Sequence, residues 1–153
     1  MSRRRSTKKR PALPTIGWRE WVLLPELCPT AIKAKVDTGA RTSSLHAFGL
    51  AVTSESLPAL ATFEVHPRQR SSASARQVEM KVEEFRAVRS SSGHTELRPV
   101  IRTPVRIGDY EFEIDLTLTS RDEMGVRMLL GRAAIRRRFL VDPGRSYRQK
   151  ELP

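Results

Sequence analysis

A strand-like pattern runs directly into a tight turn in the sequence Ile32-Lys33-Ala34-Lys35-Val36-Asp37-Thr38-Gly39-Ala40. Ile, Ala and Val alternate with the two lysines, which predicts a strand with one buried and one solvent-exposed face. The glycine permits a turn that a Cβ atom would obstruct, and the threonine hydroxyl can brace that turn. The pattern therefore predicts a strand whose end presents the carboxylate of Asp37.

A second element lies far downstream, in the sequence Leu129-Leu130-Gly131-Arg132. Asp-Thr-Gly closes many strands that have no catalytic role, so the turn alone leaves a purely structural role open. Two apolar residues followed by glycine predict a buried strand end. Together, the two elements predict half of an aspartic peptidase site.

Three further segments extend these motifs. They are Gly17-Trp18-Arg19-Glu20-Trp21, residues 33–46, and Ser120-Arg121-Asp122-Glu123-Met124. With them, the chain resembles the retropepsin-like aspartic peptidases and, among these, a bacterial family labelled ATP-dependent zinc proteases. The resemblance covers residues 14–148. It implies that Asp37 is catalytic, that Arg132 stabilises the fold by pairing with an acid, and that the active-site loop comprises Thr38, Gly39 and Ala40, supported by Leu129, Leu130 and Gly131.

A complete site requires two aspartates. Peptide hydrolysis without a metal or a covalent nucleophile needs one carboxylate to deprotonate water and a second, protonated one to donate to the scissile carbonyl. The sequence contains a single Asp-Thr-Gly. We therefore expect a symmetric homodimer in which Asp37 of each protomer faces its copy, as the resemblance also implies.

The rest of the chain predicts an all-β fold, a small retropepsin-like (acid protease) closed barrel with one short C-terminal helix. The polar turn Ser90-Ser91-Ser92-Gly93 lies between two strands and is the candidate flap. Glu111, Glu113 and Asp115 alternate with apolar residues, so we expect them on the solvent face and not among the catalytic acids. Strands are expected at 18–24, 31–36, 45–52, 61–65, 78–82, 85–89, 97–102, 105–107, 110–118 and 126–130, and the helix at 133–140.

Positive charge is concentrated at the N-terminus. Residues 1–10 hold six of the 28 basic residues and no acid, which leaves 22 basic against 17 acidic residues in the remainder. We expect residues 1–13 to form a disordered basic arm, 14–148 the peptidase domain, and 149–153 a C-terminal tail. The arm could act as a solubilising tail or contact a polyanion, and the positive body would attract acidic peptides.

Composition also limits location and cofactors. No apolar run has the roughly 20 residues needed to cross a bilayer, and no apolar segment follows the basic start as in a signal peptide, so we expect a cytoplasmic protein with no membrane association. The single Cys28 fits a reducing compartment. His46, His66, His94 and Cys28 show no metal-ligand spacing, and no phosphate-binding Gly-Lys-Ser/Thr loop is present. We therefore expect no catalytic metal and no cofactor.

Three residues are candidates for substrate binding: Arg41, His46 and Arg121. Arg41 follows the loop and could take a glutamate side chain in a bidentate pair, although a buried structural ion pair is an equal alternative. His46 could instead be a hydrogen-bonded packing residue. Asp122 and Glu123 are secondary candidates that could simply be solvated.

The resemblance also suggests a substrate and partners. Among relatives of the family is an endopeptidase that trims glutamate tails which an ATP-grasp ligase adds to a small-subunit ribosomal protein. We therefore expect an aspartic endopeptidase that acts as a homodimer on poly-glutamate tails of a ribosomal protein and is associated with such a ligase. The alternative is a non-enzymatic β-barrel module that binds the ribosome or RNA through phosphate contacts.

Overall fold

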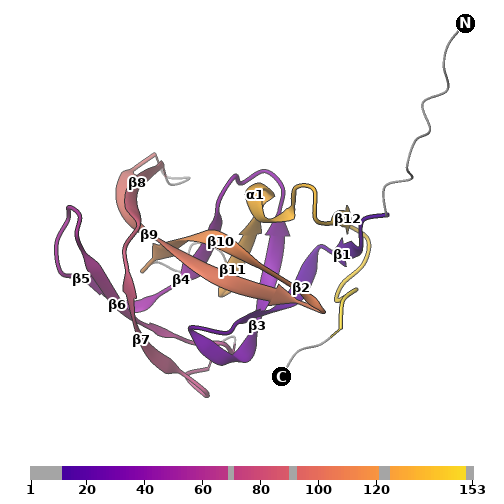
Figure 1. Ribbon diagram of the computed structural model, residues 1–153, viewed down its shortest axis with the longest axis horizontal. Helices are drawn as coiled ribbons and strands as arrows, with labels where there is room; N and C mark the ends of the chain where they lie inside the picture. The colour runs from indigo at the N-terminus through magenta and orange to yellow at the C-terminus, as the bar shows by residue number, and fades with distance from the viewer. Residues whose placement is uncertain (1–11, 69–70, 90–92, 121–124, 151–153) are drawn as a thin grey trace, which may run out of the picture.

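The computed structural model describes residues 12–68, 71–89, 93–120 and 125–150, and they form an almost all-β protein (Figure 1). The elements in chain order are β1 (Thr15–Gly17), β2 (Arg19–Leu24), β3 (Cys28–Asp37), β4 (Ser43–His46), β5 (Phe48–Val52), β6 (Leu60–Val65), β7 (Arg76–Lys81), β8 (Glu84–Arg89), β9 (Thr95–Ile107), β10 (Tyr110–Thr119), β11 (Met128–Gly131), α1 (Arg132–Ile135) and β12 (Leu140–Asp142).

Six strands close into a barrel. Their hydrogen-bonded order is β10, β4, β11, β3, β2 and β9, and β9 pairs back with β10. Closure leaves no free edge in this ring. The core is filled by inward-facing apolar side chains from all six strands, among them the fully buried Val22, Ile32, Leu45, Ile101, Leu116 and Leu130. The prediction of an all-β closed barrel with one short helix is confirmed.

The position of β11 brings the two sequence motifs together. This strand lies between β3 and β4, parallel to β3 and antiparallel to β4. Leu130 is opposite Val36 and Gly131 is opposite Asp37 in the parallel pair. The end of β3 and the end of β11 therefore lie side by side, although about ninety residues separate them in the chain.

Strands beyond the barrel differ from the sequence expectation. Strands were expected at 97–102 and 105–107, but one continuous strand, β9, spans both: its first half pairs with β8 and its second half with β10. The candidate flap residues lie between β8 and β9 in the sequence. The expected strand 45–52 is divided at Ala47, and β5, β6 and β7 form a separate three-stranded sheet beside the barrel (Figure 1).

The helix is shorter than expected. It ends at Ile135, and the backbone of Arg137 takes a left-handed conformation with φ of 65°. Leu140 then donates its N–H to the carbonyl of Pro14 (2.9 Å) and begins β12, which pairs with β1. This pairing with a distant segment outcompetes the local helical hydrogen bonds. Within the described ranges, no helix is long and apolar enough to cross a membrane.

A buried carboxylate ties the C-terminal segment to the barrel. Glu20 is only 1% exposed, and its carboxylate accepts hydrogen bonds from the backbone N–H groups of Gly17 (2.7 Å), Arg148 (2.7 Å) and Gln149 (3.1 Å). The chain at Gly17 also passes so close to Arg145 that a Cβ would lie 2.3 Å from the Arg145 carbonyl oxygen. Backbone donors stabilise a buried carboxylate, so Glu20 fixes the segment that follows β12.

Candidate active site

Asp37 lies at the end of β3 with its carboxylate held by its own loop. Oδ1 accepts hydrogen bonds from the backbone N–H groups of Gly39 (3.0 Å) and Ala40 (3.2 Å). A Cβ at position 39 would lie 3.2 Å from Oδ1, which is tighter than an ordinary van der Waals contact. The Asp37 side chain is half-buried, whereas Thr38 and Gly39 are exposed at the loop tip. The loop therefore presents an oriented carboxylate at the molecular surface.

The segment that follows β11 holds this loop from the other side. Arg132 donates its backbone N–H to the carbonyl of Ala40 (2.7 Å), and Ala133 donates to the carbonyl of Arg41 (3.0 Å). The Arg132 guanidinium donates to the carbonyl of Thr38 (3.0 Å). The resemblance had implied that Arg132 pairs with an acid. In the described part of the chain, its guanidinium instead binds a loop carbonyl.

The glycine at the end of β11 is required by close packing. Gly131 donates its N–H to the Ser43 hydroxyl (3.0 Å) in a buried hydrogen bond. A Cβ at position 131 would lie 2.5 Å from the carbonyl carbon of Thr42 and 2.6 Å from its oxygen. Any side chain here would push the Asp37 loop away from β11.

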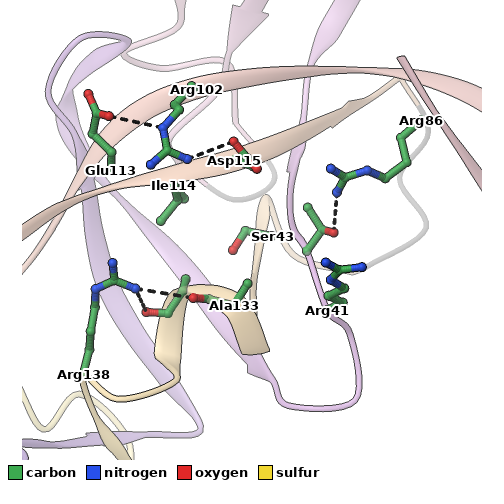
Figure 2. A pocket seen from close by; sticks show the side chains of 11 residues that line it. Arg41, Ser43, Arg86, Arg102, Glu113, Ile114, Asp115, Ala133 and Arg138 are labelled. Carbon is green, nitrogen blue, oxygen red and sulfur yellow. Dashed lines mark hydrogen bonds and ion pairs between the residues drawn. The ribbon is translucent and has the colours of Figure 1, made fainter. Parts of the chain in front are cut away.

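A cavity of about 230 Å³ opens beside the loop (Figure 2). Arg86, from β8, donates to the Thr42 hydroxyl (2.8 Å) and also forms an ion pair with Glu84. The lining comprises residues from the segment after the loop, from β4, β8, β9 and β10, and from the α1 region: Arg41, Thr42, Ser43, Arg86, Arg102, Glu113, Ile114, Asp115, Ala133, Ala134 and Arg138.

Two of the acids on β10 also line this cavity. Arg102 donates to Asp115 (3.1 Å) and to Glu113 (3.2 Å). The hydrogen bond that Arg102 donates to Asp115, together with the two negative charges, raises the pKa of Arg102 above its ordinary value, so this side chain stays charged. Glu113 and Asp115 are exposed, and their pairing with Arg102 gives them a role in shaping the cavity wall.

Comparison with known proteins places this architecture in a family. The family described as "Retropepsin-like aspartic endopeptidase RimB" matches residues 15–152. This chain belongs to the RimB-like family. The matched region contains both the Asp37 loop and the β11 support, so the prediction of a retropepsin-like family is confirmed.

Curated relatives of this RimB-like chain carry a ligase name. A "Probable alpha-L-glutamate ligase" of Shewanella halifaxensis is 45% identical over 132 residues, which are 86% of this chain and 29% of that protein. A protein of the same name from Parasynechococcus marenigrum is 47% identical over 137 residues, which are 90% of this chain and 29% of that protein. The chain therefore spans less than a third of the length of these relatives.

A solved structure shares the fold of this RimB-like chain. It is the crystal structure of a Legionella pneumophila protein of unknown function. The two align with a TM-score of 0.69 and 25% identity, over 89% of this chain and 98% of the other. The two proteins therefore share the same fold.

The structure describes three of the remaining candidate site residues, Arg41, His46 and Gly93, and only Arg41 lines the cavity. Arg41 lies beside the loop, exposed and lining the cavity. His46 is 5% exposed and stacks on Phe48 with ring centroids 3.9 Å apart, which is a packing environment. Gly93 is exposed with φ of 87° next to β9. The other flap candidates and the second loop lie outside the described residues: Ser90, Ser91, Ser92, Arg121, Asp122 and Glu123.

Sequence reasoning passed over Arg86 as a site residue. It lies in β8, where one more arginine among charged and apolar residues gives no signal of its own. Ser43 was within the motif that carried the resemblance, but its bond to Gly131 depends on β11 lying next to β4. Within the described residues, no group of three His, Cys, Asp or Glu side chains is arranged to hold a metal ion.

Proposed function

We propose that this chain is one subunit of an aspartic endopeptidase, active as a homodimer to which each protomer contributes Asp37. The observation that carries the proposal is the fixed Asp37 carboxylate: two loop N–H groups orient it, and the Gly131 to Ala133 segment holds the loop. A rigid carboxylate at a loop tip suits acid/base chemistry. The RimB-like family description supports the same reaction class.

In the proposed dimer, two Asp37 carboxylates face each other and share one proton. Two like charges in close proximity cannot both ionise cheaply, so the pair titrates as a unit. The ionised member removes a proton from water, and the protonated member donates to the carbonyl oxygen of the scissile bond. The N–H groups of Gly39 and Ala40 orient the carboxylate that they bind.

The proposed substrate is an acidic peptide, with poly-glutamate tails of a ribosomal protein as the specific case. The relatives named as alpha-L-glutamate ligases support this choice, because a domain homologous to this chain occupies part of proteins named for adding glutamate. The excess of Lys and Arg would speed the encounter with such a polyanion. An ATP-grasp glutamate ligase is the expected partner, and the cytoplasm is the expected location.

Cleavage of poly-α-glutamate by purified chain tests the proposal. We expect wild type to release shorter fragments and Asp37→Asn to release none, whereas Asp109→Asn, the same change at an exposed turn residue, should retain activity. Exhaustive chelation should leave cleavage unchanged; loss of activity that zinc alone restores would overturn the aspartic mechanism. Equal cleavage by wild type and Asp37→Asn would do the same.

Binding separates the peptidase from the non-enzymatic alternative. A module that binds ribosomal RNA through phosphate contacts should bind RNA as well or better when Asp37 loses its negative charge. We expect Asp37→Asn to remove cleavage and to leave peptide affinity largely intact. Tight RNA binding by both forms with no cleavage by wild type would favour the binding module.

A further inference from the structure

Two residues that line the cavity come directly after the Asp37 loop in the sequence. Arg41 and Thr42 follow Ala40 directly, and the Arg41 carbonyl accepts the N–H of Ala133 (3.0 Å). Arg86 of β8 and Arg102 of β9 form further walls. A side chain of a peptide bound at Asp37 could therefore enter the cavity while its backbone remains at the loop.

Four guanidinium groups line the cavity, but two of them are occupied. Arg102 is bound to two carboxylates, Glu113 and Asp115. Arg138 donates to the carbonyls of Ala133 and Ala134, at 3.4 Å in each case. In Figure 2 these two arginines lie on one side of Ser43, and Arg41 and Arg86 lie on the other.

Arg41 and Arg86, the second pair of arginines, have N–H donors that bind no acceptor in the described part of the chain. In the described part of the chain, the Arg41 guanidinium makes no ion pair or hydrogen bond and is exposed to solvent. Arg86 uses one nitrogen for the Thr42 hydroxyl and another for Glu84. A guanidinium carries five N–H donors, so Arg86 retains donors for a ligand after both bonds are made.

Two hydroxyl groups between the arginines are also set as donors. Thr42 Oγ1 accepts from Arg86 (2.8 Å), and Ser43 Oγ accepts from the Gly131 N–H (3.0 Å), which leaves each O–H proton for another acceptor. The Ser43 residue is only 3% exposed, so its hydroxyl is fixed by the surrounding structure. Arg41, Thr42, Ser43 and Arg86 therefore provide hydrogen-bond donors for a ligand group in the cavity.

We propose that this cavity is a specificity subsite for one carboxylate side chain of the substrate, with Arg86 and Arg41 as its binding residues. The inference rests on the proposed peptidase function and assigns its acidic preference to one substrate position. A carboxylate only accepts hydrogen bonds, so it matches a donor-rich site. An amide would place N–H donors against donors, and a cation would be repelled by the positive charge of Arg41, which has no ion pair in the described part of the chain. Arg86 is a specificity-determining residue, whereas Asp37 is the residue that acts on the reacting bond.

A positional scan distinguishes this subsite from a diffuse positive field. Peptides of glutamine that carry one glutamate, moved one position at a time, keep the length and shape of the substrate while moving a single charge. We expect wild type to show a kcat/KM about tenfold to hundredfold higher for glutamate at one position than elsewhere, which is the range for a charge-assisted hydrogen bond. Arg86→Gln and Arg41→Gln should each remove most of that advantage at the same position. Thr42→Val should remove a smaller part.

The matched control is Arg106→Gln, which makes the same charge change on the far part of β9, where the side chain does not line the cavity. It should keep the full positional advantage. An advantage spread evenly over all positions, or lost equally in Arg106→Gln, would overturn the subsite. Each peptide is also prepared with a free and an amidated C-terminus; a preference that follows the terminal carboxylate instead of the side chain would overturn it as well.

Peptide binding to the Asp37→Asn chain, measured by calorimetry, tests the subsite independently of the proposed peptidase function. Binding needs no turnover, so a single-position glutamate preference that Arg86→Gln removes supports the subsite even if wild type cleaves nothing. Cleavage that depends on Asp37 but shows no dependence on Arg86 supports the peptidase function and overturns the subsite. Failure of the single-glutamate peptides to bind at all would also overturn the subsite.

Discussion

The backbone N–H of Gly131 donates to the hydroxyl of Ser43 across 3.0 Å, which joins the end of β11 to the chain that leaves the Asp37 loop. These residues are 88 positions apart in the sequence. Their contact leaves no space at position 131, because a Cβ there would overlap the Thr42 carbonyl group. The loop and its support therefore form one packed unit.

Gly131→Ala tests this packing. The new methyl group must displace the Thr42 backbone, and we expect the free energy of unfolding to fall by about 1–3 kcal/mol or more, the usual cost of overpacking. We expect kcat to fall by a larger proportion than the free energy of unfolding, because the displaced Thr42 backbone follows directly after the loop that presents Asp37. The measurement is urea unfolding followed by circular dichroism, together with kcat at a temperature where the variant is folded.

The control is Gly144→Ala, because a Cβ at that position would meet only Asp142 Oδ1 at 3.4 Å, an ordinary contact. This variant should unfold at nearly the wild-type urea concentration. Wild-type stability and wild-type activity in Gly131→Ala would show that the loop does not depend on close contact with β11.

Glu20→Gln tests whether the Glu20 carboxylate fixes the segment that follows β12. Glutamine keeps the size of the side chain but has one acceptor oxygen, and its NH2 group would face the backbone donors that now bind the carboxylate. We expect the free energy of unfolding to fall by about 2–3 kcal/mol, since these bonds involve a buried charged group. The backbone N–H groups of Arg148 and Gln149 should exchange with deuterium faster than in wild type.

The exposed Glu111 provides the comparison for that experiment. Glu111→Gln removes the same charge from a residue whose ion pair with Arg106 spans 4.0 Å at the surface, where such pairs contribute little. Its unfolding curve and exchange rates should match those of wild type. Unchanged exchange rates at residues 148 and 149 in Glu20→Gln would show that Glu20 does not fix this segment.

Local patterns in the sequence carried most of the fold. Alternation predicted the strands from 110 to 118 and from 31 to 36 because one face of each is buried in the barrel, and the structure has β10 and β3 there. The Asp37 loop and its support were predicted as a pair because the two short motifs, in this order, resemble those of the retropepsin-like peptidases. Register and strand order could not be predicted, since they depend on pairing between segments far apart in the chain.

The failures have the same origin. The helix was expected to reach residue 140, but Leu140 pairs with residues near the N-terminus, and no local pattern contains that information. The cavity depends on Arg86 reaching Thr42 from a different sheet position, 44 residues along the chain. An arginine that lines a cavity and one that faces solvent are indistinguishable in a strand of alternating residues.

Salt should weaken the proposed preference for acidic peptides. The attraction that speeds encounter comes largely from exposed Lys and Arg, and the Debye length falls from about 10 Å at 0.1 M salt to about 3 Å at 1 M. We expect KM for a glutamate-rich peptide to rise with salt while kcat changes little, and we expect removal of residues 1–10 to raise KM modestly at low salt. A glutamine peptide of the same length should show no such dependence, and equal salt dependence for both peptides would contradict the electrostatic explanation.

Mixing experiments test whether two chains share one active site. If each dimer needs Asp37 from both protomers, a wild-type chain paired with Asp37→Asn is inactive. With random exchange of subunits, an equal amount of Asp37→Asn should lower wild-type activity to about half, and a ninefold excess to about a tenth. Asp109→Asn, added in the same amounts, should not lower it. Specific activity of wild type should also rise with protein concentration until the dimer saturates. Undiminished activity in ninefold Asp37→Asn, after subunit exchange has been verified by labelled chains, would show that a single protomer contains a complete site and would require a second acid from within the same chain.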